Sequence, residues 1–583
     1  MSKYDWAIED IFSSIDEFYK TCEEIENKID FSEFKGRLND AKTFLSCMKK
    51  QEELARVLDK LSVYAMMMHD TDTSSSTYDA LMSKVMSLGT KYSQSAAFIV
   101  PELTALPEET LKGYIENPLL KEYDYSLKGI LKQKAHILSE SEEKLLALAS
   151  EPFSCFKEIF TKIDNADLPL TTITHKGEKI ELSHGTYGLI MHGTDRALRQ
   201  KCFKAYYKAY KDLLNTISST YIGSVKKDVF FTRARKYNST MERALIGEDV
   251  SPKVYEKLLD CVHKALPELH DYIAEKKKIS KYKKFNMYDI YAPVCDGVEL
   301  KLSYDNAFEL VKEGLAPLGK DYIELLDKAK NERWISVYET KNKRSGAYSV
   351  CVYDTHPYVL LNYKETTHDV FTIAHELGHA MHSYYSNKNQ PYSKADYRIF
   401  VAEVASTVNE TLLIKHLLKK ATDNKLKKYL SSYLLEMIRT TVFRQTMFSE
   451  FEEYSHSTVE NNLPLTKDSM NEKYLSLNKA YYGNAVISNE EIAYEWARIP
   501  HFYRSFYVYK YATGLISALA IADRILTEGE SAVNDYKKFL SSGGSDSPIE
   551  LLKIAGVDLL TDVPYEKAFK TFSETLKNFK EYN

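Results

Sequence analysis

Apolar residues recur at helical spacing along most of this chain. In the N-terminal part, one helix face with this spacing consists of Leu54, Val57, Leu58, Leu61 and Ala65. Residues 304–329 show the same period, and so does most of the stretch from Asp396 to the C-terminus, apart from a loop over 541–545. The pattern predicts a mostly α-helical protein.

Strand-like patterns occupy two short regions. Residues 168–182 carry β-branched residues on both sides of Lys176-Gly177-Glu178, which predicts a β-hairpin. Further along, three runs with alternating or β-branched residues occur at 334–338, 347–353 and 358–363. Breaks containing Gly and Pro separate these runs, so they predict a small sheet directly before the next helix.

That next helix, residues 366–384, carries the strongest chemical pattern in the chain. Thr366 and Asp369 form a capping box at its start, and its apolar stripe consists of Val370, Ile373, Ala374, Leu377 and Met381. His375 and His379 lie four residues apart on another face, so both imidazoles can reach one metal ion. Glu376 completes an H-E-x-x-H pattern, in which it is the expected general base for a zinc-activated water.

A catalytic zinc ion needs a third protein ligand. A third histidine of the metzincin type is excluded, because His382 and Tyr385 occupy the Gly and His positions of that pattern. The remaining candidates are carboxylates of the following helix, whose apolar stripe consists of Phe400, Val404, Val408 and Leu412. They are Asp396, Glu403 and Glu410.

Glu403 is the favoured third ligand, because its apolar neighbours make an unpaired carboxylate costly there. Glu410 lies seven residues further on, on the same face, and is a candidate for orienting a ligand histidine from the outer shell. It could equally be a surface glutamate. His368 and His382 are interpreted as outer-shell or solvated histidines.

Composition narrows the class of protein. The chain has 583 residues, 44% of them hydrophobic and 28% charged, as in soluble globular proteins. A net charge of −5 with interspersed signs gives no footprint for nucleic acid. Seven scattered cysteines, no secretory signal and no membrane-spanning apolar run predict a reducing, cytoplasmic location without membrane association. We expect a helical subdomain at 1–115, a second one with the hairpin at 116–195, and a catalytic domain at 196–583.

Several motifs together resemble the oligoendopeptidase F family of thimet-type zinc peptidases. They include HELGHAMHSYYS, Glu403 in FVAEVASTVNE, KRSGAYS, RIPHFYRSFYVYKYATG and FLSSGGS. The resemblance is strong from about residue 280 and weaker over the first 200 residues. It implies one Zn²⁺ ion per chain held by His375, His379 and Glu403, with Glu376 as the catalytic carboxylate. It also implies helical lobes around a deep groove that admits oligopeptides.

The same resemblance implies that a His and a Tyr of the segment 498–514 stabilise the oxyanion. We expect His501 and Tyr507 in these roles, with Tyr509 and Tyr511 as alternatives. The strands at 334–363 offer a backbone edge to which an extended peptide could add.

The function predicted from all this is a zinc-dependent endopeptidase that cleaves short oligopeptides. A zinc carboxypeptidase of similar helical fold is one alternative; it would need a cation such as Arg498 or Arg504 to bind the substrate C-terminus. The other is a non-catalytic helical peptide-binding protein with an incidental metal site. An aminopeptidase is disfavoured, because no G-x-M-x-N segment precedes the metal helix.

Overall fold

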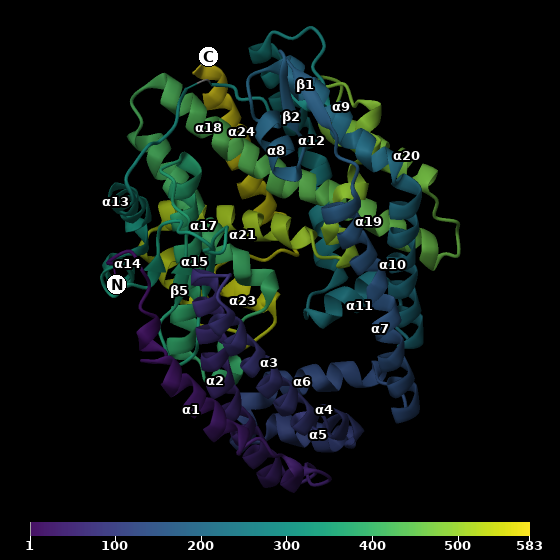
Figure 1. Ribbon diagram of the computed structural model, residues 1–583, viewed down its shortest axis with the longest axis vertical. Helices are drawn as coiled ribbons and strands as arrows, with labels where there is room; N and C mark the ends of the chain where they lie inside the picture. The colour runs from purple at the N-terminus through teal and green to yellow at the C-terminus, as the bar shows by residue number, and fades with distance from the viewer. Residues whose placement is uncertain (1, 296, 583) are drawn as a thin grey trace. The chain divides into compact units, whose positions relative to one another are not determined.

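The structure is a computed structural model that describes residues 2–295 and 297–582. Helices make up most of this described chain, and its strands form two small sheets (Figure 1). The predicted mostly α-helical class is therefore confirmed. The described residues group into two compact units, each assembled from separate stretches of sequence. The division of the chain at residues 115 and 195 stays a prediction, because it concerns consecutive segments.

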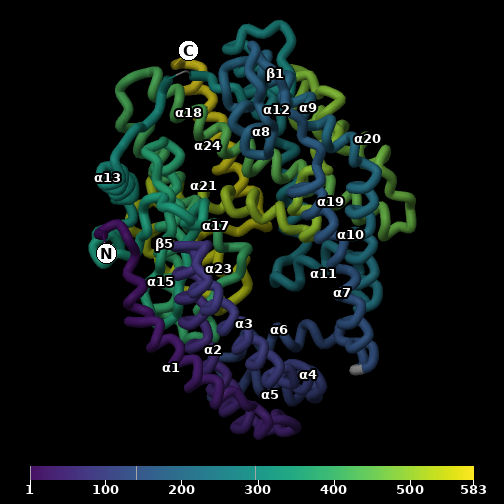
Figure 2. The backbone as a smooth tube through the Cα atoms, in the orientation of Figure 1, coloured from purple at the N-terminus to yellow at the C-terminus, as the bar shows by residue number. Residues whose placement is uncertain are grey.

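The first unit combines the N-terminal residues up to Ile137 with Glu299–His416 and Ile521–Val557. In Figure 2 these stretches run from purple to blue, from teal to green, and in yellow. Its N-terminal helices are α1 (Ile15–Glu26), α2 (Ala41–Thr71), α3 (Ser76–Ala96), α4 (Ile99–Ala105), α5 (Glu108–Glu116) and α6 (Asp124–Gln133). Its later elements are α13 (Tyr304–Leu315), α14 (Lys320–Asn331), β3 (Ile335–Ser336), β4 (Tyr348–Val350), β5 (Tyr358–Leu360), α15 (Thr367–Asn389), α16 (Tyr392–Ala395), α22 (Glu530–Leu540) and α23 (Pro548–Ile554). Two helices pass from one unit into the other, α17 (Ile399–Lys420) and α21 (Tyr509–Glu528).

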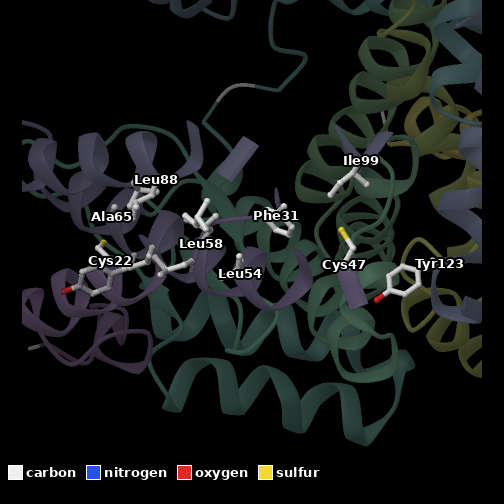
Figure 3. Packing of buried hydrophobic residues seen from close by; sticks show 14 of the residues in the cluster. Cys22, Phe31, Cys47, Leu54, Leu58, Ala65, Leu88, Ile99 and Tyr123 are labelled. Atoms are coloured by element: carbon white, nitrogen blue, oxygen red, sulfur yellow. The ribbon is translucent and has the colours of Figure 1, made fainter. Parts of the chain in front are cut away.

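One hydrophobic core joins the N-terminal helices to the sheet that precedes α15. Figure 3 shows part of this core, including Cys22, Leu54 and Leu88. The same cluster contains Tyr358 and Leu360, the outer residues of β5. Burial of these side chains is the main force that holds β5 in place. The N-terminal helices, for which the sequence predicts no chemistry, thus support the strand beside the candidate site.

The three predicted strands before α15 are present, although each is shorter than its apolar run. Their order is β3-β5-β4, with β5 parallel to β3 and antiparallel to β4. In register, Val359 is opposite Ile335 on one side and Ser349 on the other. Strand β4 therefore forms one edge of the sheet.

A buried carboxylate fastens this edge strand to the N-terminal helices. Asp70, near the end of α2, accepts a hydrogen bond of 2.7 Å from the hydroxyl of Tyr348. The guanidinium of Arg344 lies 3.3 Å from the same carboxylate, and the backbone N–H of Arg344 donates to the Asp70 carbonyl at 2.9 Å. Because buried charge is stable only when paired, Asp70 constrains the segment that leads into β4.

Helix α15 begins where the capping box predicts. The Thr366 hydroxyl accepts the N–H of Asp369, and the Asp369 carboxylate accepts the N–H of Thr366 at 3.0 Å. The whole predicted apolar stripe is buried, namely Val370, Ile373, Ala374, Leu377 and Met381. This burial leaves His375 and His379 on the half-buried face of the helix.

The second unit combines Leu138–Val298, Leu417–Ala520 and Asp558–Asn583. Its elements are α7 (Glu140–Lys162), β1 (Thr172–His175), β2 (Glu178–Glu181), α8 (His184–Met191), α9 (Arg196–Asp212), α10 (Leu214–Ala234), α11 (Thr240–Gly247), α12 (Pro252–Ser280), α18 (Asn424–Ile438), α19 (Arg444–Glu460), α20 (Lys467–Tyr482) and α24 (Val563–Glu581). Strands β1 and β2 form the predicted antiparallel hairpin. Lys176 and Gly177 at its turn both have positive φ, 50° and 87°, as a type I′ turn requires.

Two further expectations can be compared with the described residues. All seven cysteines are free thiols, in agreement with their scattered positions. Among residues 2–295 and 297–582, every helix is too short or too polar to cross a membrane.

Candidate active site

The two histidines of the H-E-x-x-H pattern turn the same ring nitrogen toward each other. His375 Nε2 and His379 Nε2 are 3.2 Å apart, and the ring centroids are separated by 4.8 Å with the planes at 80°. This geometry follows from their i, i+4 spacing on α15. Two nitrogen atoms so close together can present their lone pairs to one shared cation.

The predicted carboxylate reaches the same point from α17. Glu403 Oε2 lies 3.4 Å from His375 Nε2 and 3.8 Å from His379 Nε2. One donor atom from each of the three residues falls within a group no wider than 4.8 Å. Two imidazoles and one carboxylate are a donor set of catalytic zinc sites, so these residues fit a zinc ion. The Glu403 side chain is 39% exposed. Its surroundings are therefore more solvated than its apolar sequence neighbours suggest.

A glycine allows α15 and α17 to come close enough for this convergence. A Cβ atom on Gly378 would lie 2.5 Å from Ser406 Cα and 2.7 Å from the Ala405 carbonyl oxygen. The contact is between backbones, so no side-chain rotation would relieve it. Asn409 adds a hydrogen bond between the helices by donating to the Ala374 carbonyl at 3.0 Å.

Glu410 orients His375. Its Oε1 is 2.5 Å from His375 Nδ1, which leaves Nε2 directed at Glu403. Burial alone would lower the pKa of His375. The hydrogen bond to Glu410 and the charges of Glu410, Glu376 and Glu403 together outweigh this effect and raise the pKa to about 9. A carboxylate behind a ligand imidazole is the usual way to fix the tautomer and the ring plane of a metal-binding histidine.

His379 has the opposite electrostatic environment. Burial lowers its pKa to about 3, with repulsion from His375 adding to the effect and a hydrogen bond to the backbone of Ala402 opposing it. A neutral imidazole is the form that binds a metal. His379 is therefore ready to ligate without first losing a proton.

Glu376 has a buried carboxylate oxygen without a hydrogen-bond partner among the described residues. The side chain is 7% exposed, and Oε2 has no partner among the described residues. Burial raises the pKa of this carboxyl to about 7; Glu403 and Glu410 add to the rise and His375 opposes it. A carboxylate that is buried, unpartnered and close to neutral pKa is suited to exchange a proton with a water molecule.

The other two histidines of α15 are not part of this group of donor atoms. His368 is exposed. His382 is buried, with its ring stacked 3.7 Å from the ring of Tyr397 and 5.3 Å from that of Phe539. Its contacts support packing around the start of α17, in line with a non-ligand role.

His501 and Tyr507 lie together in the second unit. Their rings are 6.0 Å apart, and Tyr511 lies between 5.5 and 5.8 Å from both, with its hydroxyl 3.3 Å from His501 Nε2. Tyr509 is fully buried, 5.3 Å from the ring of Tyr255. Of the two alternatives to Tyr507, only Tyr511 is therefore half-exposed.

Sequence patterns alone missed several residues that shape these sites. The signal that could have identified Gly378 is a glycine inside a helical pattern, which often has a packing or functional reason. Asn409 and the neighbours of Tyr507 gave no signal of their own, since their roles depend on helices far apart in sequence.

Comparison with known proteins identifies relatives across the whole chain. The family described as Peptidase family M3 matches residues 189–571, and that described as Oligopeptidase F matches residues 102–169. Oligopeptidase PepF of Bacillus subtilis (strain 168) is 40% identical over 580 residues, which cover 99% of this chain and 87% of that protein.

Solved structures are also similar to this chain over nearly its whole length. A crystal structure of a Chlamydophila abortus protein is 34% identical, with a TM-score of 0.95, and the match covers 100% of this chain and 99% of that one. The crystal structure of oligoendopeptidase-F from Enterococcus faecium is 33% identical, with a TM-score of 0.74 and coverage of 97% and 98%.

Proposed function

The chain belongs to peptidase family M3, and on that basis we propose which of its residues carry out the reaction. It is a metal-dependent peptidase that hydrolyses internal bonds of oligopeptides. In this proposal the metal is zinc, one ion per chain, held by His375, His379 and Glu403. The observation that carries the proposal is the convergence of their three donor atoms. Glu376, the residue after His375, supports it with a buried Oε2 that has no hydrogen-bond partner among the described residues.

When bound, a zinc ion supplies a water whose pKa is about 7 and polarises the substrate carbonyl. Glu376 accepts the proton of the attacking water at Oε2 while the water oxygen bonds to the carbonyl carbon. The same carboxyl then gives this proton to the amide nitrogen, and the C–N bond breaks. The acid formed passes the second water proton to the amine, so the products are a carboxylate and an ammonium group, and Glu376 returns to its starting state.

Charge develops on the carbonyl oxygen during this reaction and needs hydrogen-bond donors. We assign that role to His501 and Tyr507, with Tyr511 as the alternative donor. Loss of one such donor typically costs about 10²–10³ in rate. The mutual contacts of these three side chains support their acting as one group.

The edge strand β4 is the proposed binding surface for the substrate backbone. An extended peptide that pairs with a strand edge is read through its main chain, so we expect wide tolerance of sequence. Gly346, just before β4, has φ of +89° and leaves open space where a Cβ would be. A side chain there would be strained.

A carboxypeptidase would need an available cation for the substrate C-terminus. Arg498 is poorly placed for this, because its guanidinium lies 5.2 and 5.1 Å from the ring centroids of Tyr187 and Tyr206.

We propose a cytoplasmic enzyme, which the free cysteines support.

The decisive experiment combines zinc analysis with hydrolysis of a fluorogenic peptide blocked at both ends. We expect about one zinc per chain, cleavage of the blocked peptide, and loss of activity with a chelator that zinc restores. Failure to cleave the blocked peptide while an unblocked one is shortened from its C-terminus would favour a carboxypeptidase.

A variant separates the enzyme from a peptide-binding protein. Glu376→Gln should retain zinc and lose about 10²–10⁴-fold in kcat. Glu324→Gln on α14, an exposed carboxylate paired with Lys320, is the matched control and should behave as the wild type. A zinc-loaded wild type without hydrolysis would contradict the proposal.

A further inference from the structure

A bulky residue next to Tyr507 has a strained backbone. Phe506 has φ of +52°, in the left-handed region that side chains with a Cβ atom avoid. Such a conformation persists only where its surroundings enforce it, and it occurs often at functional sites. The contacts of Phe506 therefore show what enforces it.

The Phe506 side chain is held by packing. It is 2% exposed, and its ring centroid lies 4.9 Å from that of His456 and 5.9 Å from that of Tyr255. These contacts fix where the ring lies. They leave the direction of the backbone at Phe506 to be set by another interaction.

That interaction comes from a buried carboxylate on α19. The Phe506 N–H donates to Glu452 Oε1 at 2.6 Å. Glu452 is 1% exposed, and its Oε2 has no hydrogen-bond partner among the described residues. The nearest imidazole, His456, donates from Nδ1 to the backbone carbonyl of Glu452, not to its carboxylate.

A carboxyl group at this buried position carries a desolvation cost. Burial raises the pKa of Glu452 to about 8, against the opposing effects of His456 and the Phe506 N–H. An apolar side chain would avoid this desolvation. Among the residues that the structure describes, the carboxylate makes one direct hydrogen bond, and its donor is the backbone N–H of the strained residue.

The turn at Phe506 determines the direction of Tyr507. The Tyr507 ring lies 4.2 Å from the Arg504 guanidinium and 5.2 Å from Lys510 Nζ, measured to the ring centroid. Both cations flank the turn in sequence. A change of backbone conformation at 506 would swing the ring away from them and away from His501.

We propose that Glu452 is a positioning residue, whose carboxyl holds Phe506 in its left-handed conformation and thereby aims Tyr507 at the substrate. This inference rests on the proposed role of Tyr507 as a hydrogen-bond donor. Glu452 itself contacts neither substrate nor metal. Its effect on the reaction passes through Tyr507.

Three substitutions test the hydrogen bond. Glu452→Met keeps the volume and removes the acceptor, and Glu452→Asp retracts the acceptor by one methylene; both should lower kcat about 10-fold with KM and zinc content unchanged. Glu452→Gln keeps an oxygen at the same place and should retain most of kcat. If Glu452→Met does not fold, Glu452→Asp decides.

The matched control is Glu450→Met on the same helix. The Glu450 carboxylate lies 2.8 Å from His263 Nε2 and accepts a hydrogen bond of 2.9 Å from Tyr481, so its loss breaks hydrogen bonds of the same helix without touching the turn. We expect a lower melting temperature and an unchanged kcat. A kcat loss equal to that of Glu452→Met would show a general packing effect and overturn the proposal.

A double-mutant cycle separates the two proposals. In a Tyr507→Phe background, Glu452→Met should add less than about a 2-fold loss, because its effect acts through the missing hydroxyl. If Tyr507→Phe lowers kcat but both Glu452→Met and Glu452→Asp leave it unchanged, the positioning role is wrong and the proposed function stands. If Tyr507→Phe itself leaves kcat unchanged, the role of Tyr507 is wrong, and with it the route proposed for Glu452.

Discussion

Two regions of the molecule place their side chains by different means: the proposed metal site of His375, His379 and Glu403, and the turn at Phe506 and Tyr507. On α15 and α17, regular helices carry His375, His379 and Glu403, and helical spacing decides which side chains share a face. At Tyr507, no helix sets the direction of the side chain. A left-handed residue held by the distant Glu452 does so instead.

This difference concerns where the free energy of positioning comes from. A helix holds its residues through its own backbone hydrogen bonds, so a change in one ligand leaves the others in place. A strained turn keeps its conformation only through tertiary contacts. We therefore expect that single substitutions at the proposed metal site cause large losses of activity. At the turn we expect smaller losses, each of which depends on the other residues of the turn.

The largest expected effect is at the third ligand. Glu403→Ala should lower activity by about 10³-fold or more, because the metal contributes several kcal/mol of transition-state stabilisation. Zinc content after dialysis should fall, while the circular dichroism spectrum stays that of the wild type. Retained zinc affinity would show that Glu403 is not a ligand. It would also weaken the contrast between the proposed metal site and the Tyr507 turn.

The next-largest effect tests whether the spacing of residues along each helix is enough to bring the three proposed ligands together, or whether α15 and α17 must also approach closely. Gly378→Ala places a methyl group 2.5 Å from Ser406 Cα, so α15 and α17 must separate. We expect a destabilisation of about 1–3 kcal/mol and a loss in kcat of up to about 10² from the displaced Glu403. Urea unfolding measures the destabilisation, and hydrolysis of the fluorogenic peptide measures the loss in kcat.

Gly89→Ala on α3 is the control for that substitution. A Cβ there meets nothing within 4 Å, so the variant should gain about 0.5–1 kcal/mol of stability and keep its zinc affinity. Equal behaviour of the two variants would contradict the close-approach role of Gly378.

A smaller loss is expected from the residue behind His375. Glu410→Gln keeps an oxygen near Nδ1 but removes the charge, and should weaken zinc binding about 10- to 100-fold. Competition with a zinc-sensitive dye measures this change. Glu313→Gln, which removes the carboxylate 3.5 Å from His416, is the matched control and should bind zinc as the wild type does.

The smallest effect is a pH dependence of stability at the turn. Burial raises the pKa of Glu452 from 4.5 to about 8, so the folded protein holds this proton more tightly than the unfolded chain does. The resulting stability is complete below pH 4.5 and is lost as the pH rises through 8. Glu452→Gln does not titrate, so its melting temperature should rise relative to the wild type by roughly 1–3 °C between pH 5 and 8. A constant difference would contradict the raised pKa.

Several elements of both units could be predicted, because their sequence signals are local. The capping box of Thr366 and Asp369, the buried stripe of α15 and the turn at Lys176-Gly177 all depend on neighbours within a few residues. The order of the strands was different. That β5 lies between β3 and β4, parallel to one and antiparallel to the other, depends on packing against N-terminal helices far away in sequence.

By itself, the sequence determined the mostly helical class, the metal helix and the face that His375 and His379 share, because backbone periodicity converts spacing into direction. Only the tertiary structure decided that Gly378 meets Ser406, that Glu410 lies behind His375, and that Glu452 holds Phe506. Each of these joins two segments that the local pattern treats as independent. Their contacts arise from the packing of whole helices, which no single stretch of the chain encodes.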